Sequence, residues 1–370
     1  MDKILGIVNL ESSGVHVEGI EDYRPVSAAS FLGRYRVLDF MISNMTNSKV
    51  NNIQVYIKNR PRSTIDHITG TNYNINTKKG HIQILHGEKA FSSEVYNTDI
   101  ANFLANKEFI EESDAPYVVI APSHFVYIQD FNALLEHHVE TKADVTIMYQ
   151  SVSNAKEAFN NCDTLELGEN KEVKAIEKNR GKYKNRDISL ECYCMSRSLL
   201  LDLMEKARKT SSLYWLSDII ADSVDELKVM AYQHKGYAAC INSLKAYYDA
   251  NLELSDYYTL KGLINDDWPI FTKTNDTCPT LYKEGAKIQG SLVGNGCIIE
   301  GEVINSVIGR NCVIKKGAVV KDSVILPSSL VNRGAKIENA VIDRYAIISH
   351  IKELKGDKDK PIYVKRRDRI

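Results

Sequence analysis

The sequence predicts an α/β domain with a mostly parallel sheet, followed by a C-terminal parallel β-helix. Strand-like and helix-like runs alternate from the start of the chain to about residue 255. Such alternation favours a mostly parallel sheet that is covered by helices on both faces. Beyond about residue 283 the pattern changes to a repeat of six residues, which is typical of a parallel β-helix.

Apolar runs define the clearest strands of the first domain. They are ILGIVNL (4–10), NIQVYIK (52–58), YVVIA (117–121) and DVTIMYQ (144–150), with helical patterns such as VLDFMISNMTNS and FNALLEHHVETK between them. The alternation lapses near Pro269 and Pro279. We therefore expect a sheet domain over residues 1–256, a connector over 257–282, and the β-helix with a C-terminal tail over 283–370.

Aliphatic residues mark the repeat of the second domain. With a spacing of six they stand at Val307, Val313, Val319, Ile325, Val331 and Ile337, and Val293 and Ile299 share the spacing before an offset. An amphipathic helix repeats at about 3.6 residues and cannot hold a period of six over this length. We expect each coil to bury these residues by stacking on the next coil.

Composition and charge argue against several classes of protein. The chain has 370 residues, and its 47 Lys and Arg nearly balance its 48 Asp and Glu, which leaves no electrostatic footprint for nucleic acid. No apolar run approaches the roughly 20 residues of a membrane span, and MDKILGIVNL lacks the features of a signal peptide. We expect a cytoplasmic protein with no nucleic-acid or membrane partner. Its seven cysteines include no C-x-x-C pair, and we expect Cys192 and Cys194 to be buried thiols.

Three stretches carry a resemblance to a known family. FLGRYRVLDFMISNMTNSKV (31–50) resembles the signature F-G-G-x-Y-R-x-I-D-F-x-L-S-N-x-x-N-S of the glucose-1-phosphate adenylyltransferases, or ADP-glucose pyrophosphorylases. YQHKGYAACINSLKAYYDANLEL (232–254) and VYNTDIANFL (95–104) are similar to two further segments of that family. The resemblance implies a Rossmann-like nucleotidyltransferase domain joined to a left-handed β-helix of hexapeptide repeats, in a tetrameric assembly.

The family's reaction joins MgATP and glucose 1-phosphate to give ADP-glucose and pyrophosphate. Such a reaction needs a metal and basic side chains around the phosphates, and a Gly-rich loop to cradle the triphosphate. Where the family places G-G-x-G-x-R after the first strand, this chain has ESSGVH (11–16), with one glycine and no arginine. The family's phosphate lysine falls on Val26, and Arg24, in the place of a family arginine, is a possible anion site.

The family's two metal aspartates are also replaced. The resemblance puts Ser123, in APSH (121–124), and Cys240, in AACINS (238–243), at those places. A neutral hydroxyl and a thiol cannot replace two anionic oxygen ligands of Mg²⁺. We therefore expect no catalytic residues, no metal site and no cofactor in this chain, and Mg²⁺ in a catalytic partner.

Some sugar-phosphate features remain by resemblance. AIEKNR (175–180) is similar to the family's F-x-E-K-P, which implies that Lys178 and Glu177 bind a sugar phosphate or an effector. Ser189 is similar in place to the serine of S-M-G-I-Y, but the family's glycine is Glu191 here. We expect His124 to be a hydrogen-bonded structural residue and the pair His137 and His138 to lie at the surface.

These features together resemble a non-catalytic subunit of the family. The resemblance implies a homo- or heterotetramer with the catalytic subunit, whose activity this chain would raise or regulate, and a sugar phosphate or nucleotide as effector. One alternative is an active nucleotidyltransferase whose metal site is rebuilt from Asp130, Asp218 or Glu191. A second alternative is a hexapeptide acyltransferase with His350 as its base.

Overall fold

The computed structural model describes residues 3–9, 15–57, 60–75, 77–87 and 97–370. Residues 11–14 of the expected phosphate loop, and residues 95 and 96 of the third resembling stretch, lie outside the described residues. The chain divides into two compact units. The sheet unit comprises Met1–Val15, Leu38–Cys240 and Trp268–Phe271, and the β-helix unit comprises His16–Val37, Ile241–Asp267 and Thr272–Ile370.

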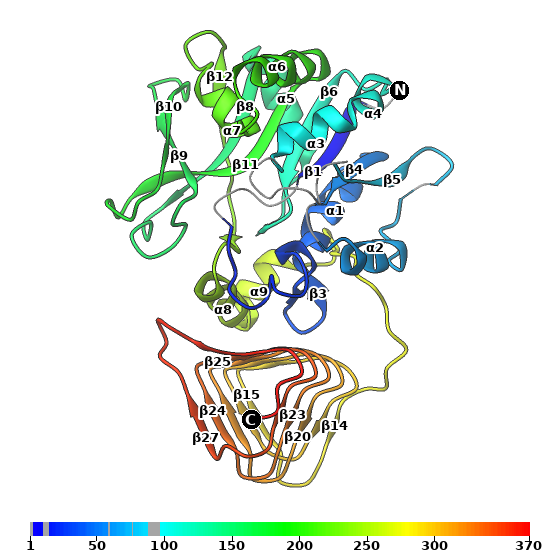
Figure 1. Ribbon diagram of the computed structural model, residues 1–370, viewed down its shortest axis with the longest axis vertical. Coiled ribbons are helices and arrows are strands. Elements are labelled where there is room, and N and C mark those ends of the chain that lie inside the picture. Colours follow the sequence, from blue (N-terminus) through cyan, green and yellow to red (C-terminus); the bar gives the residue numbers. More distant parts are fainter. Residues whose placement is uncertain (1–2, 10–14, 58–59, 76, 88–96) are drawn as a thin grey trace. The chain divides into compact units, whose positions relative to one another are not determined.

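The sheet unit is built on a mixed sheet with a parallel core (Figure 1). Among the described residues the sheet has nine strands, in the order β10-β9-β11-β6-β1-β4-β5, with β8 paired to β11 and β12. The parallel core contains β5 (His81–Leu85), β4 (Asn52–Tyr56), β1 (Ile4–Asn9) and β6 (Tyr117–Pro122). The remaining strands are β8 (Val145–Val152), β9 (Asp163–Leu167), β10 (Val173–Lys178), β11 (Arg186–Ser196) and β12 (Val229–Gln233). The expected parallel core is confirmed, and β11 runs antiparallel to β6 and β8.

Helices cover both faces of this sheet, as the alternating pattern predicted. The first face packs against α3 (Asp99–Ala105), α4 (Lys107–Glu111), α6 (Arg197–Thr210) and α7 (Leu216–Ala221). The opposite face meets α1 (Val37–Asn47) and α5 (Phe131–Thr141), because Met45 lies against Gly6 and His138 bonds to Thr146. Side chains alternate between the faces of a strand, so Gly6 and Thr146 face away from the α6 side. A further helix, α2 (Arg62–Thr69), follows β4.

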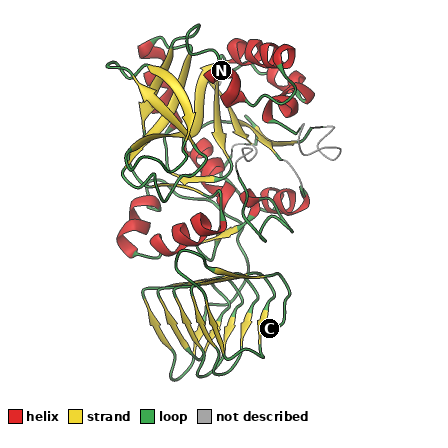
Figure 2. Cartoon of the chain, turned by 60° about the vertical axis from the view of Figure 1, so that its left-hand side comes forward, coloured by secondary structure: helices red, strands yellow, loops and turns green. Residues whose placement is uncertain are grey.

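The second unit contains the predicted left-handed β-helix, whose short strands stack in parallel (Figure 2). Over residues 281–364, all of which are described, they form three sheets of five strands. The first sheet contains β14 (Leu281–Tyr282), β17 (Ile298–Ile299), β20 (Val313–Ile314), β23 (Leu330–Val331) and β26 (Ile347–Ile348). The second contains β15 (Lys287–Gln289), β18 (Glu302–Ile304), β21 (Val319–Lys321), β24 (Lys336–Glu338) and β27 (Glu353–Lys355). The third contains β16 (Leu292–Val293), β19 (Val307–Ile308), β22 (Val324–Ile325), β25 (Ala340–Ile342) and β28 (Ile362–Val364).

The phase of the repeat differs from the one read in the sequence. Glu302 stands opposite Val319, and Val319 opposite Lys336, so a coil here has 17 residues rather than three full hexapeptides. Over residues 308–348, the Ile and Val residues of the interior are Ile308, Ile314, Val320, Ile325, Val331, Ile337, Ile342 and Ile348. A constant spacing of six therefore picks the partly exposed Val313 and Val319, because these 17-residue coils are one residue shorter than three hexapeptides.

Two segments from the first part of the sequence belong to the β-helix unit. One is residues 16–37, with a 3₁₀ turn at Val26–Ala28 and the hairpin of β2 (Ser30–Phe31) and β3 (Tyr35–Arg36). The other carries α8 (Leu244–Glu253) and α9 (Tyr257–Leu263). The structural division thus differs from a boundary at residue 256, because side chains of both segments bond to the coils.

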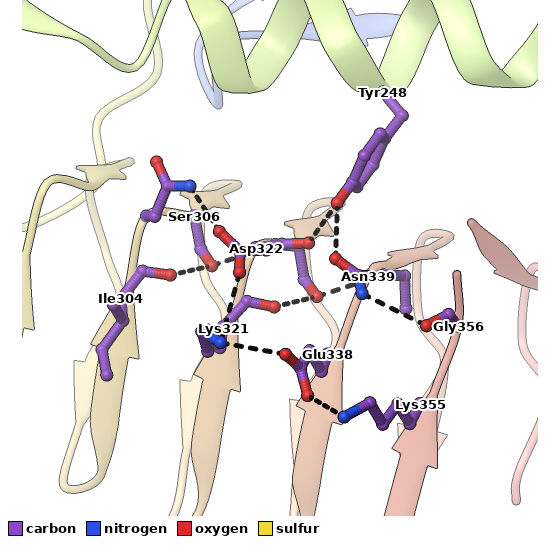
Figure 3. A network of polar contacts seen from close by, with 12 residues as sticks. Tyr248, Ile304, Ser306, Lys321, Asp322, Glu338, Asn339, Lys355 and Gly356 are labelled. Atoms are coloured by element: carbon purple, nitrogen blue, oxygen red, sulfur yellow. Dashed lines mark hydrogen bonds and ion pairs between the residues drawn. The ribbon is translucent and has the colours of Figure 1, made fainter. Parts of the chain in front are cut away.

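A polar ladder along one corner of the β-helix anchors α8 (Figure 3). Asn305, Asp322 and Asn339 repeat at this corner, each with a positive φ that these residue types tolerate. Asn305 donates to the carboxylate of Asp322, and Asn339 donates to the carbonyl of Gly356. The buried Tyr248 of α8 donates its hydroxyl toward the Asp322 carbonyl at 2.8 Å and lies 3.1 Å from the Asn339 side-chain oxygen.

We predict that Tyr248→Phe lowers the free energy of unfolding of the β-helix unit by about 1 kcal/mol, because it removes the hydroxyl that faces two partly buried acceptors. Calorimetry of the full chain is the measurement. Tyr257→Phe is the matched control, since Tyr257 is 65% exposed and the same change there should have no effect. Equal unfolding temperatures for the two variants would show that the hydroxyl of Tyr248 does not stabilise the unit.

Candidate functional site

The structure places Ser123 at the carboxyl end of the parallel core and Cys240 on the short strand that pairs with the segment following Ser123. β6 ends at Pro122, and Ser123 follows directly, with its amide bonded to the carbonyl of Asn9 at the end of β1. β7 (Phe125–Tyr127) pairs antiparallel with β13 (Ala238–Cys240), so that Cys240 stands opposite Phe125. Open α/β sheets bind ligands at this edge. The two residues therefore lie where the fold would hold a metal.

The chemistry of this pair does not suit Mg²⁺. Burial, together with the neighbouring Cys162, raises the pKa of the Cys240 thiol well above its usual value, so the group stays neutral. The buried hydroxyl of Ser123 has no hydrogen-bond partner among the described residues. Mg²⁺ requires hard, mostly anionic oxygen ligands. In the part of the chain that the structure describes, no three His, Cys, Asp or Glu side chains are grouped to hold a metal ion.

His124 is buried, but it is not the hydrogen-bonded residue that the sequence suggested. Neither ring nitrogen has a hydrogen-bond partner among the described residues. Its Nε2 lies 3.7 Å from Oε2 of Glu191, which is beyond hydrogen-bond reach. Burial, and then the charge of Lys178, lowers the pKa of His124 to about 3. The imidazole is therefore neutral at physiological pH and offers one donor and one acceptor to a ligand or a water.

This depressed pKa predicts a pH dependence of stability. Between pH 6.5 and about 3 the unfolded chain binds a proton at His124 that the folded chain does not, so this residue destabilises the fold as the pH falls below 6.5. At pH 5 the expected loss is about 2 kcal/mol. We predict that His124→Gln loses less stability than the unaltered chain between pH 7.5 and 5, measured by urea unfolding. His350→Gln, at an exposed histidine, is the control. Parallel pH profiles for the His124→Gln variant and the unaltered chain would contradict this prediction.

Lys178 lies near His124 and Cys240, and its ammonium already forms an ion pair with a carboxylate. Its ammonium is 2.8 Å from Oδ1 of the buried Asp163. Burial alone would lower the pKa of Lys178, but Asp163, with Glu191 and Asp218, raises it above the usual value. The lysine side chain remains 38% exposed. It is thus a charged group at the rim of the site, held by Asp163.

Lys178, Glu177 and Ser189, the residues expected to bind a sugar phosphate or an effector, differ in exposure and in their partners. Glu177 is 65% exposed and lies 3.8 Å from Arg186. The Ser189 hydroxyl is buried and accepts a hydrogen bond from the backbone amide of Glu191. Glu177 and Lys178 do border a surface cavity of about 730 Å³ next to the loop that precedes β11.

Val26 and Arg24 belong to the β-helix unit, and both are buried there. Arg24 donates from Nη2 to Oδ1 of Asp343 at 2.6 Å, with side-chain exposures of 4% and 0%. The interpretation of Arg24 as a possible anion site needs correction, because its guanidinium is used by this internal ion pair. Val26, fully buried in the 3₁₀ turn, offers an apolar side chain where the resembling family has its lysine.

The carboxylates considered for a rebuilt metal site have other partners. Asp130 caps α5 by accepting from the amide of Asn132, and Asp218 caps α7 by accepting from the amide of Trp215. Glu191 belongs to β11, and its Oε2 lies 3.7 Å from Nε2 of His124. His350, the base required of an acyltransferase, is exposed, and its backbone amide bonds to the carbonyl of Ile370 at the chain end.

The sequence analysis missed Asp99, the first residue of α3. Its buried carboxylate accepts from the side chain of Asn9 and from the amides of Ile100 and Leu216, which joins β1, α3 and α7. Burial raises the pKa of Asp99 to about 6 in spite of these hydrogen bonds. One sequence signal could have drawn attention to Asp99. Thr98 is a typical helix N-cap residue, and an acidic residue directly after it is typical of the first turn of a helix.

The fold and this edge of the sheet define a nucleotidyltransferase-like protein with a C-terminal hexapeptide β-helix. A nucleotidyl transferase family model matches residues 23–256, and a model described as GlmU-like, C-terminal hexapeptide matches residues 279–360. The chain is similar to the glycogen biosynthesis protein GlgD of Geobacillus stearothermophilus, at 31% identity over 86% of this chain and 83% of that protein. It therefore belongs to the nucleotidyl transferase family, within the group that contains this relative.

Two further relatives cover most of the chain. The glycogen biosynthesis protein GlgD of Bacillus subtilis is 26% identical over 99% of this chain and 96% of its own length. The glucose-1-phosphate adenylyltransferase of Bacillus anthracis is 26% identical over 87% of this chain and 86% of its own length. The resemblance stated from the three sequence stretches is thus confirmed. Among the described helices, none is long and apolar enough to cross a membrane.

Proposed function

We propose that this chain acts in glycogen biosynthesis as a non-catalytic or weakly active regulatory subunit of glucose-1-phosphate adenylyltransferase. It would assemble with a catalytic subunit into a heterotetramer and raise or modulate that subunit's rate. Relatives named as glycogen biosynthesis proteins and as glucose-1-phosphate adenylyltransferases support the pathway and the partner.

One observation carries the non-catalytic part of the proposal. At the carboxyl end of the parallel core, where the resemblance implies two metal-binding carboxylates, the chain has the neutral Ser123 and the protonated thiol of Cys240. Attack on a triphosphate depends on metal and basic groups to stabilise the transition state. Loss of a metal site removes several kcal/mol of that stabilisation, and each 1.4 kcal/mol is about tenfold in rate.

The alternative of an active enzyme with a rebuilt metal site finds less support. It requires distant carboxylates to converge, and Asp130 and Asp218 are used as helix caps. We propose that the chain itself needs no cofactor and that Mg²⁺ is bound by the catalytic partner. We also propose that the chain is cytoplasmic and that a sugar phosphate or a nucleotide is its effector.

Assembly tests the partnership directly. The purified chain, a purified catalytic subunit and their mixture are compared by light scattering coupled to size-exclusion chromatography. We expect the mixture to give one species that contains both chains and has the mass of four subunits. Two separate peaks at the masses of the individual proteins would refute the partnership.

A further inference from the structure

A groove beside β12 is lined by cationic and aromatic side chains that the candidate site does not use. Its volume is about 600 Å³, and all of its lining residues belong to the sheet unit. They come from β8, β12, α5 and the turn between β9 and β10 (Figure 1). A cavity of this size can hold a small molecule. The lining side chains with ligand-binding chemistry are Asp130, His137, Tyr149, Lys171, Tyr232 and Lys235.

Lys171 has its ammonium in this groove without a carboxylate partner. Its Nζ donates to the hydroxyl of Tyr149 at 2.9 Å and lies 5.6 Å from the centre of that ring. The described residues give this lysine no ion pair, and the adjacent Glu172 is paired with Lys174. Because the Tyr149 oxygen accepts from the ammonium, its own proton remains available to a ligand.

The backbone around both lysines is fixed, although their side chains are exposed. The carbonyl of Lys171 accepts from the amide of Ala231 in β12 at 2.8 Å. Directly after Lys235, the carbonyl of Gly236 accepts from the side chain of Gln150 at 2.6 Å. Lys235 also forms no ion pair within the described part of the chain. Two uncompensated cations therefore stand on ordered backbone in one groove.

His137 adds a ring nitrogen that lacks a partner. Its Nε2 is buried and has no hydrogen bond to any described residue, while the ring packs edge-on against Tyr232 with the ring centres 5.3 Å apart. A buried polar atom of this kind calls for a ligand or a water. Asp130 is the acidic member of the described lining, and it already caps α5. The two ammonium groups thus leave the groove with an excess of positive charge.

We propose that this groove binds a phosphate monoester, whose terminal oxygens accept from the ammonium groups of Lys171 and Lys235 and from the hydroxyl of Tyr149. A phosphate monoester offers three terminal oxygens to these three donor groups, whereas a carboxylate offers only two. The groove is larger than inorganic phosphate requires, so the organic part of the ester lies against the rings of His137 and Tyr232.

The groove lies outside the candidate site, because Ser123, Cys240 and Lys178 do not line it. A ligand here would leave the carboxyl edge of the parallel core unoccupied. That the bound ester acts as an effector rests on the proposed function, whereas its binding to the isolated chain does not.

Calorimetric titration of the full-length chain at pH 7.5 tests the site with inorganic phosphate, glucose 6-phosphate and adenosine 5′-monophosphate. We expect at least one of the two esters to bind about tenfold or more tightly than inorganic phosphate, because only an ester fills the groove. The double variant Lys171→Gln with Lys235→Gln should bind that ester at least about tenfold more weakly, since it lacks both charged donors. Lys336→Gln, at an exposed lysine of the β-helix unit, is the control and should bind it unchanged.

Tyr149→Phe separates this groove from a general attraction of anions to lysines, because it removes one donor and keeps both charges. We expect it to weaken binding of the ester about threefold or more. The proposal is overturned if neither ester binds more tightly than inorganic phosphate, or if the double lysine variant or Tyr149→Phe binds the ester as tightly as the unaltered chain. Any of these results leaves the assembly experiment, and hence the proposed function, untouched.

Discussion

Asp343→Ala is expected to destabilise the β-helix unit by about 3–5 kcal/mol, because it leaves the buried guanidinium of Arg24 without its counter-charge. The carboxylate of Asp343 is fully buried and accepts from Arg24 at 2.6 Å and from the hydroxyl of Tyr363 at 2.5 Å. It also accepts from the backbone amide of Arg344. The substitution therefore leaves several donors unpaired at once, which is the costly way to break a buried ion pair.

Calorimetry of the full chain measures this loss. Lys287→Ala is the matched control, because it breaks an ion pair with Glu302 whose side chains are 74% and 36% exposed, and exposed pairs contribute about 0–1 kcal/mol. Replacing both partners, as in Arg24→Met with Asp343→Leu, should recover only part of the lost stability: buried pairs tolerate apolar replacement, but the Tyr363 hydroxyl and the Arg344 amide still lose their acceptor. If Asp343→Ala unfolds at the same temperature as Lys287→Ala, the ion pair does not hold residues 16–37 to the coils.

A second large effect is expected from returning carboxylates to the edge of the sheet. The double variant Ser123→Asp with Cys240→Asp places two like charges at buried, neighbouring positions, so it should lose several kcal/mol of stability in the absence of a divalent ion. Mg²⁺ should restore part of this loss, because a ligand that binds the folded state stabilises it by mass action. The unaltered chain should show no Mg²⁺-dependent change in its unfolding temperature.

Ser123→Asn with Cys240→Asn is the uncharged control for this experiment and should not respond to Mg²⁺. A Mg²⁺-dependent stabilisation of the unaltered chain equal to that of the aspartate variant would contradict our interpretation of Ser123 and Cys240. We do not expect the aspartate variant to become an efficient enzyme, because Val26 still replaces the basic residue that the family resemblance implies.

The fold was largely predictable from local patterns. Buried apolar runs located β1, β4, β6 and β8, and a short repeat of aliphatic residues identified the β-helix. The exact phase of the coils was not predictable, because the one residue by which such a coil falls short of three hexapeptides is visible only when Glu302, Val319 and Lys336 are seen to pair.

The environments of single side chains were less predictable. His138 was expected at the surface, but it is buried and its Nδ1 lies 2.8 Å from Oγ1 of Thr146. The buried thiols of Cys192 and Cys194 are confirmed. Arg24 finds its partner Asp343 more than 300 positions along the chain, and no sequence pattern reports such a contact. By contrast, the strands beside Ser123 and Cys240 could be located from the sequence, because each has a recognisable flank.

The central claim is that this chain modulates a catalytic partner and is itself nearly inactive. The most direct measurement is ADP-glucose formation from ATP, Mg²⁺ and glucose 1-phosphate by this chain alone, by the catalytic subunit alone and by their mixture. We predict a rate for this chain about 1000-fold or more below that of the catalytic subunit, and a mixture whose rate differs from that of the catalytic subunit alone. Robust synthesis by the isolated chain, or a mixture that performs no differently from the catalytic subunit alone, would contradict the account.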